Sequence, residues 1–142
     1  MTLIESGTGN VFCDTSFFYA CLDHRDLHHQ RARAFLEEAA TAHVVFYCTW
    51  DIVSETVTLL RYRCSYERAL RFLDRVKPAL RMVAYDESVQ HQAEAIFRRL
   101  GSDKRLSFCD ALSFVVVTIL LDHMPCLSFD RDFKQLGLTV IS

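Results

Sequence analysis

Hydrophobic positions along the chain gather into short runs, with longer amphipathic stretches between them. Residues 44–48 form a β-branched and aromatic run without clean alternation, which is typical of a strand buried on both faces of a parallel sheet. Other short apolar runs predict further strands at residues 11–13, 80–84, 126–129 and 138–141. The stretches between the runs repeat apolar residues at helical spacing, as in residues 28–40, 66–76 and 89–100.

This alternation of strands and helices predicts the fold class. We expect one α/β domain over residues 1–142, with a mostly parallel central sheet of four to five strands flanked by helices. Residues 1–9 would form an N-terminal extension before the first strand. The apolar segment 114–119 has strand-like composition, but Ser107 and Asp110 resemble a capping box, so we predict a buried helix there.

Composition narrows the function classes only a little. Eighteen acidic and sixteen basic residues give a net charge of −2, so binding to nucleic acid would need a local basic patch. The six Cys residues show no C-x-x-C spacing, and the first ten residues do not resemble a signal peptide. The longest apolar run, residues 111–121, is shorter than the roughly 20 residues that cross a bilayer. We expect a cytoplasmic protein with free thiols and no membrane contact.

Acidic residues stand at places where a parallel sheet collects functional groups. Asp14 follows the first predicted strand and Asp130 follows the fourth. Ligands of open α/β sheets bind beyond the carboxyl ends of strands, so these two carboxylates converge if their strands are neighbours. Taken singly, each Asp is better explained as a helix cap or a turn residue. Asp110, in the first turn of a predicted helix, could be there only because a negative charge stabilises the helix N-terminus. Glu55 could lie on the solvated face of its helix, at the border of the apolar face that includes Trp50.

Four segments together resemble the PIN-domain nucleases, and especially the VapC-type toxins of toxin–antitoxin pairs. The segments are Val11-Phe12-Cys13-Asp14-Thr15-Ser16, Val53-Ser54-Glu55-Thr56, Ser107-Phe108-Cys109-Asp110-Ala111-Leu112-Ser113 and Leu127-Ser128-Phe129-Asp130-Arg131-Asp132-Phe133. They follow the order of the family, and the resemblance spans about residues 10–141. Ser128 departs from the family's frequent Thr but keeps the hydroxyl.

The resemblance implies a metal-dependent endoribonuclease. Asp14 and Asp110 would be the main ligands of Mg²⁺ or Mn²⁺, and Glu55 and Asp130 would complete the set, because clustered carboxylates need a hard cation. One metal would activate a water for attack on the RNA phosphodiester, and a second could stabilise the leaving oxygen. Ser16 and Ser128 would orient water or phosphate. Asp132 is a further possible ligand, and Asp103 could stand in an outer shell or in a solvated loop. The resemblance also implies an RNA substrate, a cognate antitoxin and a homodimer.

Basic residues cluster where they could follow an RNA backbone. Residues 61–81 contain seven basic and two acidic residues, whereas residues 1–60 contain three basic and eight acidic ones. The candidates for RNA contact are Arg61, Arg63, Arg68, Arg105 and Arg131. A solvated helix face explains the first cluster equally well.

Three alternatives compete with the toxin nuclease. A PIN-like module without nuclease activity could bind RNA or protein, but the complete acid set argues against it. A housekeeping RNA-processing nuclease would carry the same residues. A response-regulator receiver or a haloacid-dehalogenase-like phosphatase needs acid pairs that Asp14-Thr15-Ser16 does not provide. We expect Cys13, Cys48 and Cys126 to be core residues, Trp50 to pack rather than to stack on bases, and the group His24, His28 and His29 not to bind zinc.

Overall fold

A five-stranded parallel sheet organises the chain in the computed structural model, which describes residues 3, 7 and 9–142. The strands are β1 (Asn10–Cys13), β2 (Val45–Cys48), β3 (Arg81–Met82), β4 (Cys126–Leu127) and β5 (Val140–Ile141), in the order β3-β2-β1-β4-β5. Because β1 pairs with both β2 and β4, the strand order reverses between β1 and β4. The predicted fold class is therefore confirmed.

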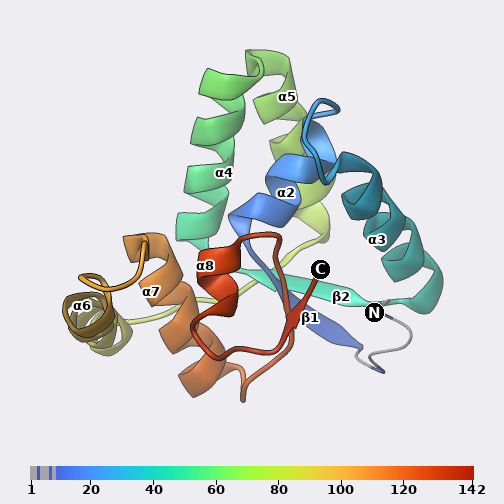
Figure 1. Cartoon of the computed structure of the whole chain (residues 1–142). Helices are drawn as coiled ribbons and strands as arrows, with labels where there is room; N and C mark the ends of the chain where they lie inside the picture. The colour runs from blue at the N-terminus through green and yellow to red at the C-terminus, as the bar shows by residue number, and fades with distance from the viewer. Residues whose placement is uncertain (1–2, 4–6, 8) are drawn as a thin grey trace.

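Helices cover the sheet on both sides (Figure 1). They are α2 (Thr15–Leu22), α3 (His29–Ala42), α4 (Trp50–Arg63), α5 (Tyr66–Arg71), α6 (Glu87–Leu100), α7 (Phe108–Val115) and α8 (Arg131–Lys134). Helix α2 packs against α3 and α4, and α6 packs against α7. Two helices widen into π-helical turns, α5 at Phe72–Val76 and α7 at Val116–Leu120. The segment 114–119 is thus helical, as predicted.

The core lies between the sheet and these helices. Its largest fully buried side chains are Phe12, Phe17, Phe18, Phe35, Phe72 and Phe133. The three cysteines predicted to be core residues are all buried and unpaired. No helix among the described residues has the length and hydropathy of a membrane span.

Several predicted boundaries and one predicted core residue are wrong. The predicted strand 80–84 shrinks to exposed Arg81 and Met82, because only those residues pair with β2 at the edge of the sheet. Trp50 is 65% exposed, with Lys77 Nζ 5.8 Å from the centre of its ring. The buried face of α4 is centred on Ile52, Val53, Thr56 and Leu60, and Trp50 lies about a quarter turn away from that centre. The predicted extension 1–9 falls mostly outside the described residues.

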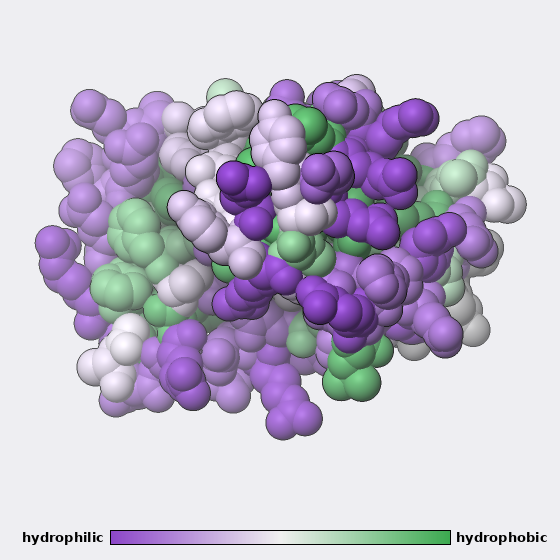
Figure 2. All heavy atoms as spheres, turned by 90° about the horizontal axis from the view of Figure 1, so that it is seen from above, coloured by the Kyte–Doolittle hydropathy of each residue, from purple (hydrophilic) through white to green (hydrophobic). Residues whose placement is uncertain are grey.

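The surface is mostly hydrophilic when the molecule is viewed from above (Figure 2). Hydrophobic side chains gather on the side where α6 and α7 lie. Phe97 and Phe108 are 40% and 44% exposed there, and their rings meet edge to face at 5.7 Å.

Candidate active site

A cavity of about 460 Å³ opens at the carboxyl edge of β1 and β4. Four predicted acids line it from four different parts of the fold: Asp14 after β1, Glu55 from α4, Asp110 from α7 and Asp130 before α8. The structure thus brings together all four carboxylates that the sequence singled out. The cavity is also lined by Thr15, Ser16, Tyr19, Asp26, His28, Leu59, Arg63, Arg105, Ser107 and Phe129.

Two hydroxyl groups, one from just after β1 and one from just after β4, fix the Asp14 carboxylate. Its Oδ2 accepts hydrogen bonds from Ser16 Oγ at 2.8 Å and from Ser128 Oγ at 2.9 Å. It also caps α2 by accepting from the Ser16 backbone N–H. Burial raises the pKa of Asp14, the two hydroxyl hydrogen bonds lower it, and nearby Asp130 raises it, with a net increase. The Asp14 carboxylate is therefore fixed in position, but burial and the charge of Asp130 disfavour its ionised form.

Asp110 is fixed by the capping box that the sequence predicted. Its Oδ2 accepts from the Ser107 backbone N–H at 3.2 Å, and its own N–H donates to Ser107 Oγ at 3.0 Å. Burial, followed by the charge of Asp14, raises the pKa of Asp110 to about 7 despite the hydrogen bonds from Ser107. The charged form of this carboxyl group is therefore disfavoured unless a cation offsets its charge.

Asp130 and Glu55 complete the acidic lining. Asp130 caps α8 through the Asp132 backbone N–H, and its own N–H donates to Ser128 Oγ at 3.1 Å. Burial raises the pKa of Glu55, the nearby Thr15 hydroxyl lowers it, and neighbouring carboxylates raise it again, with a net increase. The Thr15 hydroxyl is buried beside the Glu55 carboxylate, on which it exerts this effect.

This donor set fits a hard divalent cation. Within the described residues, none of the four carboxylates forms an ion pair with Lys or Arg. In addition to burial, the charge of Asp130 raises the pKa of Asp14, and the charges of Asp14 and Asp130 raise the pKa of both Glu55 and Asp110. Among the described residues, no group of three or more His, Cys, Asp or Glu side chains has the arrangement of a complete metal site. Mg²⁺ commonly binds through one or two carboxylates and keeps several waters, so it does not need a closed protein cage.

The other predicted residues are only partly at the cavity. Ser16 lines it, whereas Ser128 is fully buried behind it and contacts Asp14 and Asp130. Asp132 donates its backbone N–H to Asp130, and Asp103 lies exposed after α6; neither lines the cavity.

Two of the five basic candidates, Arg63 and Arg105, lie at the cavity. Arg61 stands 5.3 Å from the ring of Tyr66, and Arg68 lines a second cavity beside Arg25. Arg131 is exposed at the start of α8.

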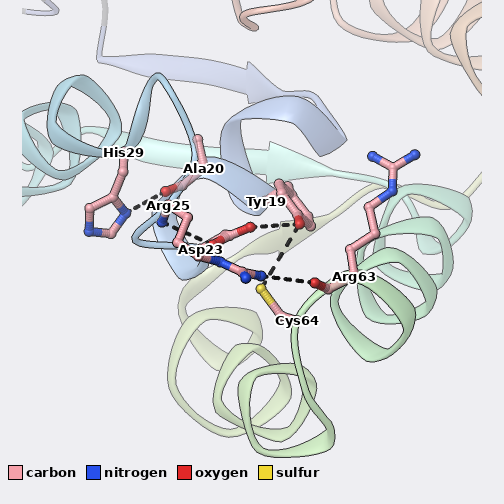
Figure 3. A network of polar contacts seen from close by, with 7 residues as sticks. All are labelled: Tyr19, Ala20, Asp23, Arg25, His29, Arg63 and Cys64. Carbon is pink, nitrogen blue, oxygen red and sulfur yellow. Dashed lines mark hydrogen bonds and ion pairs between the residues drawn. The ribbon is translucent and has the colours of Figure 1, made fainter.

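Sequence reasoning missed the residues that the loop between α2 and α3 contributes. A polar network anchors that loop to α2 and α4 (Figure 3). Tyr19 Oη donates to Asp23 Oδ2 at 2.7 Å, and the Arg25 guanidinium pairs with Asp23 and donates to the Arg63 carbonyl at 3.2 Å. Burial alone would raise the pKa of Asp23, but the hydrogen bond from Tyr19 and the N–H of Arg25 lower it to about 2. Such a loop carries no periodic pattern that would reveal its contacts.

Most of the chain matches the model of a known protein family. The PIN-domain model matches residues 11–138, which include all four acidic segments. The chain belongs to the PIN-domain family. The resemblance that the four motifs indicated is confirmed, whereas the roles of the individual residues stay predictions.

Two similar proteins are VapC proteins. A VapC ribonuclease from Archaeoglobus fulgidus is 28% identical over 124 residues, which cover 85% of this chain and 77% of that protein. VapC20 of Mycobacterium tuberculosis, a toxin that cleaves the sarcin–ricin loop, has a similar crystal structure. Its TM-score is 0.77 at 27% identity, over 90% of this chain and 95% of that one. FitAcB from Neisseria gonorrhoeae has a TM-score of 0.65 at 14% identity, over 93% and 96% of the two chains, which shows a shared fold. The VapC ribonuclease and the VapC20 toxin support a toxin-type nuclease.

Proposed function

We propose that this PIN-domain protein is a divalent-metal-dependent endoribonuclease and the toxin of a toxin–antitoxin pair. The observation that carries the proposal is the convergence of Asp14, Glu55, Asp110 and Asp130 on one cavity, where no Lys or Arg of the described residues pairs with them. The similarity to a VapC ribonuclease and to the VapC20 toxin supports RNA as the substrate.

Each residue at the cavity has a role in this proposal. Asp14 and Asp110 would hold Mg²⁺ or Mn²⁺, and Glu55 and Asp130 would complete the set directly or through water. The bound cation would neutralise the carboxylates and lower the pKa of a water for in-line attack on the phosphodiester bond. Ser16 and Ser128 orient the Asp14 carboxylate through its Oδ2 atom. Arg63 and Arg105, at the rim, would contact RNA phosphates.

The proposed partners follow from the same cavity. An antitoxin segment that covers the cavity would block access to the four carboxylates, and a basic side chain on it would satisfy their charge. A homodimer, as the family resemblance implies, remains part of the proposal.

Replacing Asp110 tests the nuclease assignment directly. Asp110→Asn keeps an acceptor for the Ser107 N–H but cannot bind a cation through a charged oxygen, so RNA cleavage should fall at least about 100-fold. The wild type and Asp110→Asn are each incubated with ribosomal RNA or total cellular RNA in the presence of Mg²⁺ or Mn²⁺. The cleavage products are then resolved on a sequencing gel. Asp103→Asn, an exposed Asp outside the cavity, is the matched control and should cleave like the wild type. Equal cleavage by wild type and Asp110→Asn would refute the assignment.

The rim arginines predict a specific salt dependence. Arg63→Ala and Arg105→Ala should each weaken RNA binding and reduce the slope of log K against log salt by about 0.7, the value for one contact with a single-stranded phosphate. Fluorescence anisotropy with labelled RNA between 50 and 300 mM KCl, roughly the range over which such slopes are resolved, would measure this. Arg75→Ala, exposed and away from the cavity, is the control. A slope reduced equally by Arg75→Ala would contradict the assignment of the rim.

A further inference from the structure

An aromatic pair lines part of the acidic cavity and has no part in the proposed chemistry. The rings of His28 and Phe129 are stacked, with centroids 4.5 Å apart and planes inclined by only 6°. Both residues line the cavity and both are half-buried. Phe129 immediately precedes Asp130 in the chain, so the stack lies one residue from a carboxylate of the site.

Phe129 is held in place on several sides. Its backbone N–H donates to Ser16 Oγ at 2.9 Å, and the same hydroxyl donates to Asp14. Its ring also contacts the rings of Phe17 and Phe35, each with centroids 6.4 Å away. The base of the stack is therefore fixed by the core and by the hydrogen bonds that position the acids.

His28 is held by the loop between α2 and α3. Asp26 Oδ1 accepts from the His28 backbone N–H at 2.8 Å, and the Asp23 carbonyl accepts from the Asp26 N–H at 3.0 Å. The network of Asp23, Tyr19 and Arg25 ties this loop to α2 and α4, and the ring of His29 bonds to the Ala20 carbonyl (Figure 3). The loop thus holds the backbone of His28 in place, and the stack with Phe129 sets the plane of the His28 ring.

We propose that the His28–Phe129 stack is a platform for one nucleobase of the RNA, next to the phosphate at the four carboxylates. This inference rests on the proposed nuclease function and adds a base-binding subsite to it. The face of a flat ring offers a phosphate no hydrogen-bond donor, whereas every base has a face that stacks on His or Phe. The platform needs an unstacked base, so the substrate is single-stranded or looped RNA at this position.

Binding of base-carrying and abasic RNA tests the platform without relying on cleavage. All measurements use the Asp110→Asn background, so that the RNA stays intact, with Mg²⁺ present. The probes are a labelled single-stranded RNA of twelve adenosines and the same ribose-phosphate chain without bases. One stacked base contributes about 5- to 150-fold in affinity. Adding His28→Ala should therefore weaken binding of the adenosine RNA at least about fivefold and leave binding of the abasic chain unchanged.

Two further variants separate stacking from a structural effect. His28→Tyr keeps a stacking ring and should retain most of the affinity, and 2-aminopurine placed in the RNA should be quenched by this variant but not by His28→Ala. His91→Ala, an exposed His on α6, is the matched control and should bind both probes normally.

Three results would overturn the platform: unchanged binding in His28→Ala, an equal loss for the abasic chain, or no measurable preference for bases in the parent protein. Cleavage of RNA by the wild type is measured separately, so failure of the nuclease proposal remains distinguishable.

Discussion

Asp14→Asn should lower the rate of RNA cleavage by about 100- to 1,000-fold, the largest effect that we expect from one substitution. Asp14 is the most buried of the four acids and accepts hydrogen bonds from both Ser16 and Ser128. Asn removes the charge that a cation needs but remains a good helix cap, so α2 should still form. The rate is measured under single-turnover conditions with saturating Mg²⁺ or Mn²⁺.

The fold of Asp14→Asn serves as its internal check. Because burial and Asp130 penalise the charge of Asp14, the metal-free variant should unfold at the same temperature as the wild type or higher. Asp132→Asn, whose side chain lies outside the cavity, is the control for activity. Wild-type rates for Asp14→Asn at saturating metal would contradict its role.

The metal-free protein should become less stable as the pH rises from about 4 to about 7. The pKa of Asp110 is raised to about 7 in the folded state, first by burial and then by Asp14, from 3.8 in the unfolded chain. The folded state therefore binds this proton more tightly, and the stability it contributes is complete below pH 4 and lost as the pH rises through 7. The difference corresponds to at most about 4 kcal/mol. The raised pKa values of Asp14 and Glu55 act in the same direction.

Urea denaturation in EDTA between pH 5 and pH 8 measures this effect. Asp110→Asn should flatten the dependence, because the group no longer titrates. Added Mg²⁺ should restore stability at pH 8 in the wild type more than in the variant. Two results would show that the four acids do not repel one another as described. One is a wild-type stability that rises with pH in EDTA, and the other is the same pH dependence in the wild type and in Asp110→Asn.

The sequence predicted the fold because its signals are local and mutually consistent. Apolar runs located all five strands, and the Ser107–Asp110 capping box identified α7 correctly despite its strand-like composition. The lengths of the edge strands could not be predicted, because they depend on how far a neighbouring strand extends, as Arg81–Met82 shows. Trp50 was placed wrongly because the buried face of α4 is set by its neighbours in space rather than by its own pattern.

The acids of the candidate site were predictable and their surroundings were not. Asp14 and Asp130 follow strands, and strand ends converge whenever the strands are neighbours. The support that Ser128 gives to Asp14 depends on the register of β1 against β4, which no local pattern encodes. The stack of His28 on Phe129 joins a loop to a strand end far along the chain, and its residues carry no common motif.

The chemistry of the RNA ends tests the central claim most directly. Wild-type protein is incubated with total cellular RNA in EDTA, then with Mg²⁺ or Mn²⁺ restored, and the new ends are identified. A cation-activated water should leave 5′-phosphate and 3′-hydroxyl ends at discrete positions, only when metal is present. Cleavage that persists in EDTA and leaves cyclic phosphates, or no cleavage with either metal, would contradict a metal-dependent nuclease built on Asp14, Glu55, Asp110 and Asp130.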